Sequence, residues 1–351
     1  MIDLDDPQVF RQLNSEGMLR CLSEMPWQCQ QAWEMTMNFD LPRDYSKVNK
    51  VVLLGMGASA IAAELVSSLV VSEAKLPIFI CRDYDLPAFV DAKTLVIASS
   101  YSGMTEETLS SFEQALKTEA KKLVITTGGK LRIMAAERNI PVFSFHYQAQ
   151  PRAALGFSLM AIFGLLQKLG VISDKSADVA ETVQTLHQLS PKISEGVVLS
   201  RNPAKQLARL LYGHLPVIYG ASVLYGVARR WKTQLNENSK AWAFYEVSPE
   251  LNHNAVVGYQ FPQELANKVV VVLLRSASLP RTIQLSYLSV CELLKQAKVD
   301  YQFVDGEGTS QLCQMMSLLL FGDYTSCYLA VLYQIELTPV SAIDYLKSKL
   351  A

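Results

Sequence analysis

Two short segments of the sequence combine glycine with hydroxyl side chains, a composition suited to holding a phosphate group. They read Gly-Met-Gly-Ala-Ser-Ala at 55–60 and Ser-Ser-Tyr-Ser-Gly-Met-Thr at 99–105. Glycines let backbone N–H groups approach an anion, hydroxyls donate hydrogen bonds, and a helix N-terminus favours negative charge. We therefore expect a phosphate cradle whose donors are Gly57, Ser59, Ser100, Ser102 and Thr105.

Two other interpretations of these segments stay open on the residues alone. Ser102 or Thr105 can serve only as a helix cap. The first segment also begins like the Gly-x-Gly-x-x-Gly turn of dinucleotide-binding proteins, and Asp83 follows at a plausible distance for a ribose contact. However, Ala60 occupies the position of the third glycine, and a dinucleotide site leaves the second, hydroxyl-rich segment unexplained.

Three residues elsewhere carry groups that can move a proton or stabilise the charge that results. Glu237 lies in Asn-Glu-Asn-Ser-Lys, His253 in Ser-Pro-Glu-Leu-Asn-His-Asn, and Arg152 in Pro-Arg-Ala-Ala-Leu. A carboxylate can act as a base, a histidine titrates near neutral pH, and an arginine is a fixed cation for a developing oxyanion. These groups suit aldose–ketose isomerisation through an enediol. Taken singly, each is also an ordinary surface glutamate, loop histidine or helix-start arginine.

The runs around these residues predict the scaffold that positions them. Apolar, β-branched runs that end at a turn are typical of buried parallel strands. Strands are expected over 51–54, 78–81, 94–99, 122–126 and 141–145, and again over 217–220, 269–274 and 301–304. Helices are expected over 6–39 (one or two), 59–72, 105–117, 153–169, 177–189 and 311–335, with a break at Ser190-Pro191.

Strands that alternate with helices predict an α/β fold with two doubly wound halves, each a parallel sheet flanked by helices. The second half repeats the architecture of the first, although few residues are identical. We expect an N-terminal helical segment over 1–45, a first domain over 46–190, and a second domain over 191–351 that ends in a C-terminal helix. Doubly wound sheets bind ligands at the carboxyl ends of their strands, where both cradle segments fall.

Four motifs in the same order resemble those of the bifunctional phosphoglucose/phosphomannose isomerases, which have tandem sugar-isomerase (SIS) domains. Residues 99–105 resemble the SIS phosphate-binding signature. The other motifs are residues 151–155, the paired segments 236–240 and 248–254, and Pro-x-x-x-Ile-Asp-x-Leu-Lys at 339–347. The sequence departs from the family pattern at Ala58, where glycine is frequent, and at Met104, where asparagine is frequent.

The resemblance implies an aldose–ketose isomerase that interconverts glucose 6-phosphate, and also mannose 6-phosphate, with fructose 6-phosphate. It assigns proton transfer between C1 and C2 to Glu237. It assigns ring opening to His253 together with Lys347, and stabilisation of the enediolate to Arg152.

The resemblance also extends to the C-terminus and to assembly. Thr338 resembles a small pocket residue that leaves room for either epimer, and Lys349 competes with Lys347 for the ring-opening role. We expect no cofactor, no metal, and a homodimer with shared active sites in which the histidine reaches across the interface.

Composition limits the other classes of function. The 351 residues carry 32 basic and 33 acidic side chains, for a net charge of −1, so nothing indicates a nucleic-acid partner. The six cysteines form no Cys-x-x-Cys pair, which favours buried reduced thiols, and no His/Cys cluster has metal-ligand spacing. The acidic N-terminus and the lack of an apolar run of about 18 residues predict a cytoplasmic protein without a membrane span.

Two rival functions share parts of this pattern. A non-catalytic SIS sensor binds a sugar phosphate and regulates a partner, but has no need of Glu237, His253 and Lys347. An amino-sugar isomerase with a glutaminase domain requires an N-terminal cysteine nucleophile. The sequence has no such cysteine, and its first 40 residues have helical spacing.

Overall fold

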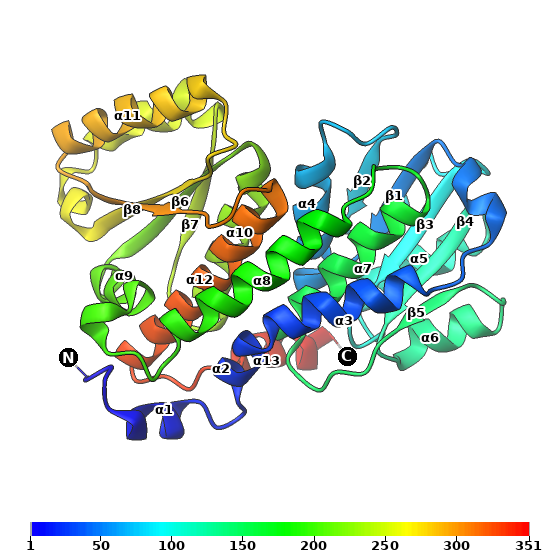
Figure 1. Cartoon of the computed structure of the whole chain (residues 1–351), viewed down its shortest axis with the longest axis horizontal. Coiled ribbons are helices and arrows are strands. Elements are labelled where there is room, and N and C mark those ends of the chain that lie inside the picture. Colours follow the sequence, from blue (N-terminus) through cyan, green and yellow to red (C-terminus); the bar gives the residue numbers. More distant parts are fainter. Residues whose placement is uncertain (1, 351) are drawn as a thin grey trace. The chain divides into compact units, whose positions relative to one another are not determined.

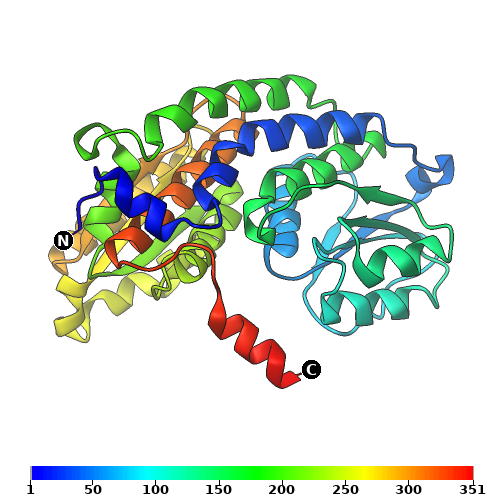
Figure 2. The same cartoon turned by 90° about the horizontal axis from the view of Figure 1, so that it is seen from below.

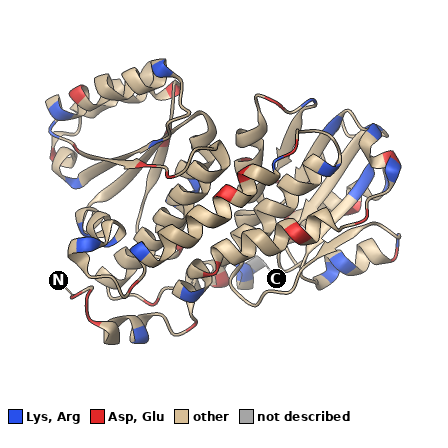
Figure 3. Cartoon of the chain, viewed as in Figure 1, with Lys and Arg blue, Asp and Glu red and all other residues tan. Residues whose placement is uncertain are grey.

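The computed structural model describes residues 2–350 of the chain. The chain forms two compact units, one made of 24–183 and the other of 1–23 together with 184–351. Figure 1 shows a separate sheet in each unit. Figure 3 shows basic and acidic residues interspersed along the ribbon of both units, in keeping with the near-zero net charge.

The unit made of 24–183 contains a five-stranded, fully parallel sheet in the order β2-β1-β3-β4-β5. Its strands are β1 (Lys50–Leu54), β2 (Ile78–Cys81), β3 (Thr94–Ser99), β4 (Lys121–Thr126) and β5 (Val142–Ser144). Its helices are α3 (Met25–Met37), α4 (Gly57–Val70), α5 (Glu106–Ala115), α6 (Gly129–Ala136) and α7 (Leu155–Lys168). All five expected strands are present: β2 and β3 have the expected bounds, and the ends of the other three lie within one residue of them.

Helices cover both faces of this sheet, which is why its central strands are apolar throughout. Val52, Val96 and Val124 point to one face and pack with Phe112 of α5 and Leu131 of α6. Successive side chains of a strand point to opposite faces, so the alternate residues of β1 and β3, which are equally buried, belong to the other face. There α4 contacts β1 and β2, and α7 packs on α3 and α4.

The second unit has a four-stranded parallel sheet in the order β7-β6-β8-β9. Its strands are β6 (Leu215–Ala221), β7 (Phe244–Ser248), β8 (Val269–Arg275) and β9 (Asp300–Asp305). Its helices are α1 (Pro7–Leu13), α2 (Met18–Ser23), α9 (Pro203–Leu211), α10 (Tyr225–Glu237), α11 (Arg281–Gln296), α12 (Gln311–Leu332) and α13 (Ser341–Leu350). Two parallel sheets flanked by helices confirm the predicted α/β fold.

The N-terminal helices divide between the two units. Three helices, α1, α2 and α3, cover the region where one or two were expected, and only α3 belongs to the unit made of 24–183. The preceding segment is fixed to the second unit, since Leu337 N–H donates to Leu13 O at 3.0 Å and Ser15 N–H donates to Glu336 Oε1 at 3.2 Å. The expected limits of the two SIS domains, 46–190 and 191–351, stay predictions.

The break expected at Ser190-Pro191 was wrong. Helix α8 (Ser176–Ile193) continues through Pro191 to Ile193. Proline in a helix removes one N–H donor and crowds the preceding turn, but here only two residues of helix follow it. Packing holds this last turn in place, because Ile193 is fully buried and its carbonyl accepts a hydrogen bond of 2.5 Å from Tyr328 Oη.

One helix departs from the expectation that no segment has the properties of a membrane span. Among the described residues, α12 alone is long and apolar enough to qualify by length and composition. Nearly all of it is buried inside its unit, where it contacts α9, α10, α1, α2 and β9. A helix that is apolar all round is also the pattern of a central core helix, which is the position of α12 here.

Candidate active site

The cradle segments follow β1 and β3, the two strands between which the sheet order reverses. β1 pairs with β2 on one side and with β3 on the other, so the connections after β1 and β3 lead away in opposite directions. Such a reversal leaves a crevice at the carboxyl ends of the strands, where doubly wound proteins bind ligands. The structure therefore places both predicted segments at the preferred ligand position of this unit.

Hydroxyl groups meet in the second cradle segment. Ser100 Oγ lies 2.9 Å from Thr105 Oγ1 and accepts a hydrogen bond of 3.1 Å from Gly103 N–H. Ser102 Oγ accepts from Met104 N–H at 3.2 Å. Thr105 is the N-cap residue of α5, but its side chain makes no cap hydrogen bond. The first amides of α5 therefore have no side-chain cap, and helix capping does not account for the hydroxyl of Thr105.

The first cradle segment brings a second helix N-terminus to the same edge. α4 begins at Gly57, which has a φ of +49°, and no side chain caps this helix. Ser59 in its first turn is 5% exposed. Two uncapped helix starts and a set of hydroxyls suit an anion such as phosphate.

Glycine is required at position 103 by both conformation and space. Gly103 has a φ of +65°, in the left-handed region. A Cβ built there would lie 1.9 Å from the carbonyl oxygen of Gly128. The backbones of the loops after β3 and β4 are thus in direct contact. Leu131 N–H donates to Gly103 O at 3.0 Å.

Arg152 belongs to the same unit as the cradle and is not a surface residue. It lies in the 3-10 turn Pro151–Ala153 and is only 3% exposed. This turn contacts α4, the helix that starts in the cradle. The cradle loop also fixes the segment before Arg152, because Tyr101 Oη donates to Tyr147 O and accepts from Ala149 N–H at 3.1 Å. A buried guanidinium beside the cradle offers a fixed charge for an anionic group.

Glu237 lies at the end of α10 in the other unit, and α12 holds that end in place. Arg230 and Asp323 form a buried two-pronged ion pair between the helices, with Nε–Oδ1 at 3.2 Å and Nη2–Oδ2 at 2.8 Å. Asn238, directly after Glu237, donates to Ser326 Oγ at 2.9 Å. Both contacts tie α10 to α12, and the second holds the backbone next to Glu237.

A lysine that sequence reasoning left without a role ties Glu237 to Thr338. Lys240 Nζ donates to Asn238 O at 3.1 Å, to Glu336 O at 2.6 Å and to Leu337 O at 3.2 Å. Thr338, which is 2% exposed, follows this segment directly. The structure thus brings Glu237 and Thr338 into one neighbourhood. Lys240 is the lysine of the Asn-Glu-Asn-x-Lys motif, so the motif itself could have pointed to it.

His253 lies at the opposite end of the sheet from Glu237. α10 leaves the carboxyl end of β6 and returns to the amino end, where Glu237 precedes β7. His253 is in the 3-10 turn Glu250–His253, after the carboxyl end of β7. Five strand residues span about 16 Å, so β7 separates the two side chains within one chain. His253 is exposed, while the buried Leu251 anchors its turn.

The C-terminal helix α13 carries both candidate lysines. Residues 341–349 are all exposed, and Figure 2 shows α13, in red, extending from the rest of its unit. Lys349 Nζ lies 5.5 Å from the ring centroid of Tyr345, four residues earlier on the helix. This contact joins two exposed side chains of one helix, and both Lys347 and Lys349 stay candidates for the ring-opening role.

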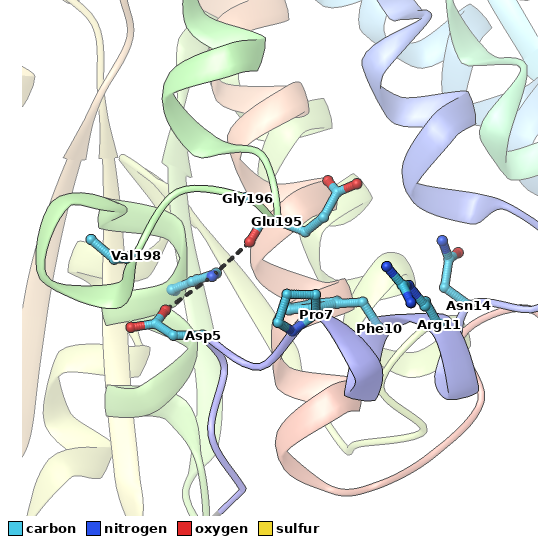
Figure 4. A pocket seen from close by; sticks show the side chains of 9 residues that line it. Asp5, Pro7, Phe10, Arg11, Asn14, Glu195, Gly196 and Val198 are labelled. Carbon is cyan, nitrogen blue, oxygen red and sulfur yellow. Dashed lines mark hydrogen bonds and ion pairs between the residues drawn. The ribbon is translucent and has the colours of Figure 1, made fainter.

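A separate cavity of about 370 Å³ lies near the N-terminus. The residues around it hold the N-terminal segment in place. Figure 4 shows it lined by Asp5, Phe10 and Glu195, among other residues. Lys205 is completely buried beside it and donates to Leu4 O at 2.6 Å, Asp5 Oδ1 at 3.2 Å and Glu195 O at 2.9 Å. Burial lowers the pKa of Lys205, and Asp5 opposes that shift. All three N–H donors are used, so Lys205 anchors the N-terminal segment.

The cysteines and the acidic groups are possible nucleophiles and metal ligands in the part of the chain that the structure describes. All six cysteines are free and buried, as expected from their apolar surroundings. Burial raises the pKa of the Cys29 thiol to about 12, and a protonated thiol is a poor nucleophile. Within residues 2–350, no three His, Cys, Asp or Glu side chains are grouped as metal ligands.

Comparison with known proteins agrees with the motifs. Residues 200–350 match the bacterial phospho-glucose isomerase C-terminal SIS domain. The chain is 40% identical to the bifunctional phosphoglucose/phosphomannose isomerase of Caldicellulosiruptor bescii, covering 95% of this chain and 99% of the relative. It is 35% identical to the protein of the same name from Aquifex aeolicus, covering 89% and 93%.

The fold has a similar counterpart among solved structures. Hypothetical protein TT0462 from Thermus thermophilus superimposes with a TM-score of 0.73 at 16% identity, over 98% of this chain and 92% of that one. At that identity the likeness concerns the fold alone. The sequence relatives decide the family: this chain belongs to the bifunctional phosphoglucose/phosphomannose isomerases.

Proposed function

We propose that this protein interconverts glucose 6-phosphate, and also mannose 6-phosphate, with fructose 6-phosphate through an enediol. The observation that carries the proposal is the paired hydroxyls of Ser100 and Thr105 at the uncapped start of α5, beside the reversal of strand order. That arrangement suits a phosphate ester. The relatives named for this activity support the choice of hexose 6-phosphates.

In this proposal Gly57, Ser59, Ser100, Ser102 and Thr105 hold the 6-phosphate, and Arg152 stabilises the enediolate. Glu237 moves the proton between C1 and C2, because α12 fixes its position. Lys347 assists ring opening. Thr338, next to the Lys240 clamp, leaves room at C2 for either epimer.

His253 completes the site only if a second chain supplies it. In one chain, Glu237 and His253 lie at opposite ends of β7. β7 is an edge strand, and Trp242 and Phe244 on this segment are 80% and 51% exposed. An exposed edge with large aromatic side chains is a ready interface. We therefore infer a homodimer in which each active site takes its histidine from the partner.

A coupled assay with each aldose 6-phosphate, run with and without a chelator, tests the activity. We expect turnover of both epimers, without added nucleotide, and retained activity in chelator because no metal ligand set is proposed. A regulator of the SIS sensor type binds the sugar phosphates without turnover, so binding in the absence of isomerisation contradicts the proposal.

Variants of Glu237 and His253 test the division of roles. Glu237→Gln keeps the shape but removes the base, and positioned acid/base groups contribute about 10²–10⁴-fold. We expect the rate for both epimers to fall at least about 100-fold while sugar-phosphate binding persists. His253→Ala removes only assistance to ring opening, so substrate supplied in open-chain form should partly restore its activity.

Exchange of the C2 proton of glucose 6-phosphate with deuterated solvent identifies the base directly. Folded Glu237→Gln should exchange this proton far more slowly than the parent, with circular dichroism as the check on folding. Glu292→Gln, on the exposed face of α11 and outside the motif segments, is the matched control and should exchange at the parent rate. Parent-rate exchange by Glu237→Gln excludes Glu237 as the base.

A further inference from the structure

Gln28 is a buried amide to which neither the sequence motifs nor the proposed site assigns a role. It lies near the start of α3, in the unit that contains the cradle, and is fully buried. Its Nε2 donates to Ala153 O at 2.9 Å and to Tyr147 Oη at 3.2 Å. Ala153 directly follows Arg152 in the same 3-10 turn. The amide of Gln28 therefore holds the backbone next to Arg152.

The partners of this amide fix its orientation. A carbonyl oxygen can only accept, so the atom that faces Ala153 O has to be the amide nitrogen. Tyr147 Oη accepts from the same nitrogen and donates its own proton to Glu24 Oε2 at 2.7 Å. Among uncharged side chains, only the amides of glutamine and asparagine carry two N–H donors on one atom, and asparagine is shorter. The position thus calls for glutamine.

The segment that carries Arg152 is held at its two ends by different elements. Tyr101, in the second cradle segment, donates to the carbonyl at its beginning, Tyr147 O. Gln28 donates to the carbonyl at its end, Ala153 O. Arg152 lies between these two anchors and is 3% exposed. Together the anchors set the position of the guanidinium relative to the hydroxyls of the cradle.

Close packing leaves Gln28 little room to move. A Cβ built at Gly156, in the first turn of α7, would lie 2.8 Å from Gln28 Cβ and 3.1 Å from its Oε1. Trp27, the neighbouring residue of α3, packs edge-on against Phe157 with ring centroids 5.7 Å apart. Both contacts place α3 against the beginning of α7, directly after the Arg152 turn. Gln28 is therefore a rigid support for that turn.

We propose that Gln28 is a positioning residue for Arg152: its amide holds the turn so that the guanidinium meets the enediolate. This inference rests on the role proposed for Arg152 in isomerisation. The enediolate forms only after a proton has left the substrate, and an interaction made mainly at that stage raises kcat. The 6-phosphate is held by other groups, those of the cradle. Loss of the Gln28 amide should therefore lower kcat and leave KM nearly unchanged.

Gln28→Met tests the proposal, because it keeps the length of the side chain and removes both N–H donors. We expect kcat for glucose 6-phosphate to fall at least about fivefold, with KM within about twofold of the parent value. Exchange of the C2 proton with deuterated solvent follows the same step in slower chains and should fall by the same factor. In an Arg152→Ala chain, adding Gln28→Met should change this exchange rate by less than about 1.5-fold, because the positioned group is gone.

Thr36→Val is the matched control in the same helix. Thr36 is fully buried, and its Oγ1 donates to Ala32 O at 2.6 Å within α3. It meets α7 at Gly164, where an added Cβ would lie 2.8 Å from Thr36 Cγ2. The variant thus removes a buried donor at another contact of the two helices. It should keep the parent kcat, and thermal melts report any loss of packing separately.

Tyr147→Phe is a milder second variant, for use if Gln28→Met does not fold. It removes the acceptor of one Gln28 N–H but leaves the bond to Ala153 O. We expect kcat to fall at least about twofold where Arg152 is present, and no further fall in the Arg152→Ala chain.

Three results contradict the proposal at different levels. Parent kcat in Gln28→Met, or an equal loss with and without Arg152, overturns the positioning role alone. Parent-rate isomerisation by Arg152→Ala, with Gln28 intact, refutes the role proposed for Arg152 and the positioning role with it. A parent chain without isomerase activity refutes the proposed function, and this inference with it, before any variant is compared.

Discussion

Ser100 and Thr105 combine an observed local role with the ligand-binding role proposed for them. Ser100 Oγ both accepts from Gly103 N–H and meets Thr105 Oγ1. The first contact shapes the loop and the second orients two hydroxyls at the start of α5. Neither hydroxyl makes a cap hydrogen bond to that helix, so both are available to donate to an anion.

Replacing both hydroxyls should therefore weaken substrate binding. Hydrogen bonds to charged groups contribute about 1.5–3 kcal/mol each. For Ser100→Ala combined with Thr105→Ala, we expect KM for fructose 6-phosphate to rise, or kcat to fall, at least about tenfold. Thr105→Ser keeps the hydroxyl and should remain close to the parent. Unchanged steady-state kinetics in the double variant would remove these residues from the phosphate site.

At the scale of elements, the cradle depends on two loops that touch through their backbones. Gly103 after β3 faces Gly128 after β4, and the two loops leave no room for a Cβ at Gly103. The two parallel strands β3 and β4 set this distance through their register. A side chain at Gly103 would have to move one loop, and with it the hydroxyls of the cradle.

Gly103→Ala should consequently lose both stability and substrate affinity. The left-handed conformation costs alanine about 1–2 kcal/mol, and the contact with Gly128 O adds to this. Gly170→Ala is the matched control in the same unit, because Gly170 has a φ of +72° with nothing within 4 Å of an added Cβ. Thermal melts should show a clearly larger loss for Gly103→Ala, and only that variant should raise KM. If the two variants lose equal stability, the left-handed backbone conformation alone accounts for the need for glycine at position 103.

At the scale of the whole molecule, the separation of Glu237 and His253 makes a single chain insufficient for the proposed mechanism. The two groups stand at opposite ends of β7, about 16 Å apart along the strand. The exposed aromatic side chains beside β7 offer a surface for a second copy. Two-fold symmetric pairing would exchange the histidines of the two chains.

Mixing two inactive variants tests this exchange. Glu237→Gln and His253→Ala protomers should form mixed dimers in which one of the two sites has both native groups. Random exchange makes half of the dimers mixed, so activity should recover to roughly a quarter of the parent value. A mixture of Glu237→Gln with the double variant Glu237→Gln/His253→Ala is the control and should recover nothing. If the first mixture also stays inactive while dimers exchange, the histidine is not shared.

The sequence was sufficient to predict most of the strands and to locate the two segments proposed as the phosphate cradle. Buried parallel strands are continuous apolar runs, and the glycines and hydroxyls after β1 and β3 need only local chemistry to be noticed. The same local reasoning wrongly predicted a helix break at Pro191. α8 continues past the proline because Ile193 is buried. Local reasoning also missed β7, an edge strand of mixed composition, Phe-Tyr-Glu-Val-Ser, without an apolar run.

The sequence by itself determined the α/β class, the family motifs and the position of the glycine- and hydroxyl-rich segments after β1 and β3, because these depend on residues close together in the chain. Only the tertiary structure decided that the first helices pack with the C-terminal unit, through contacts such as Leu13 with Leu337. It also decided that Lys240 clamps the Thr338 segment and that β7 separates Glu237 from His253. The first two contacts join residues that are distant in the chain. The separation of Glu237 from His253 depends on the direction in which α10 returns across the sheet. Neither kind of feature leaves a periodic pattern in the sequence.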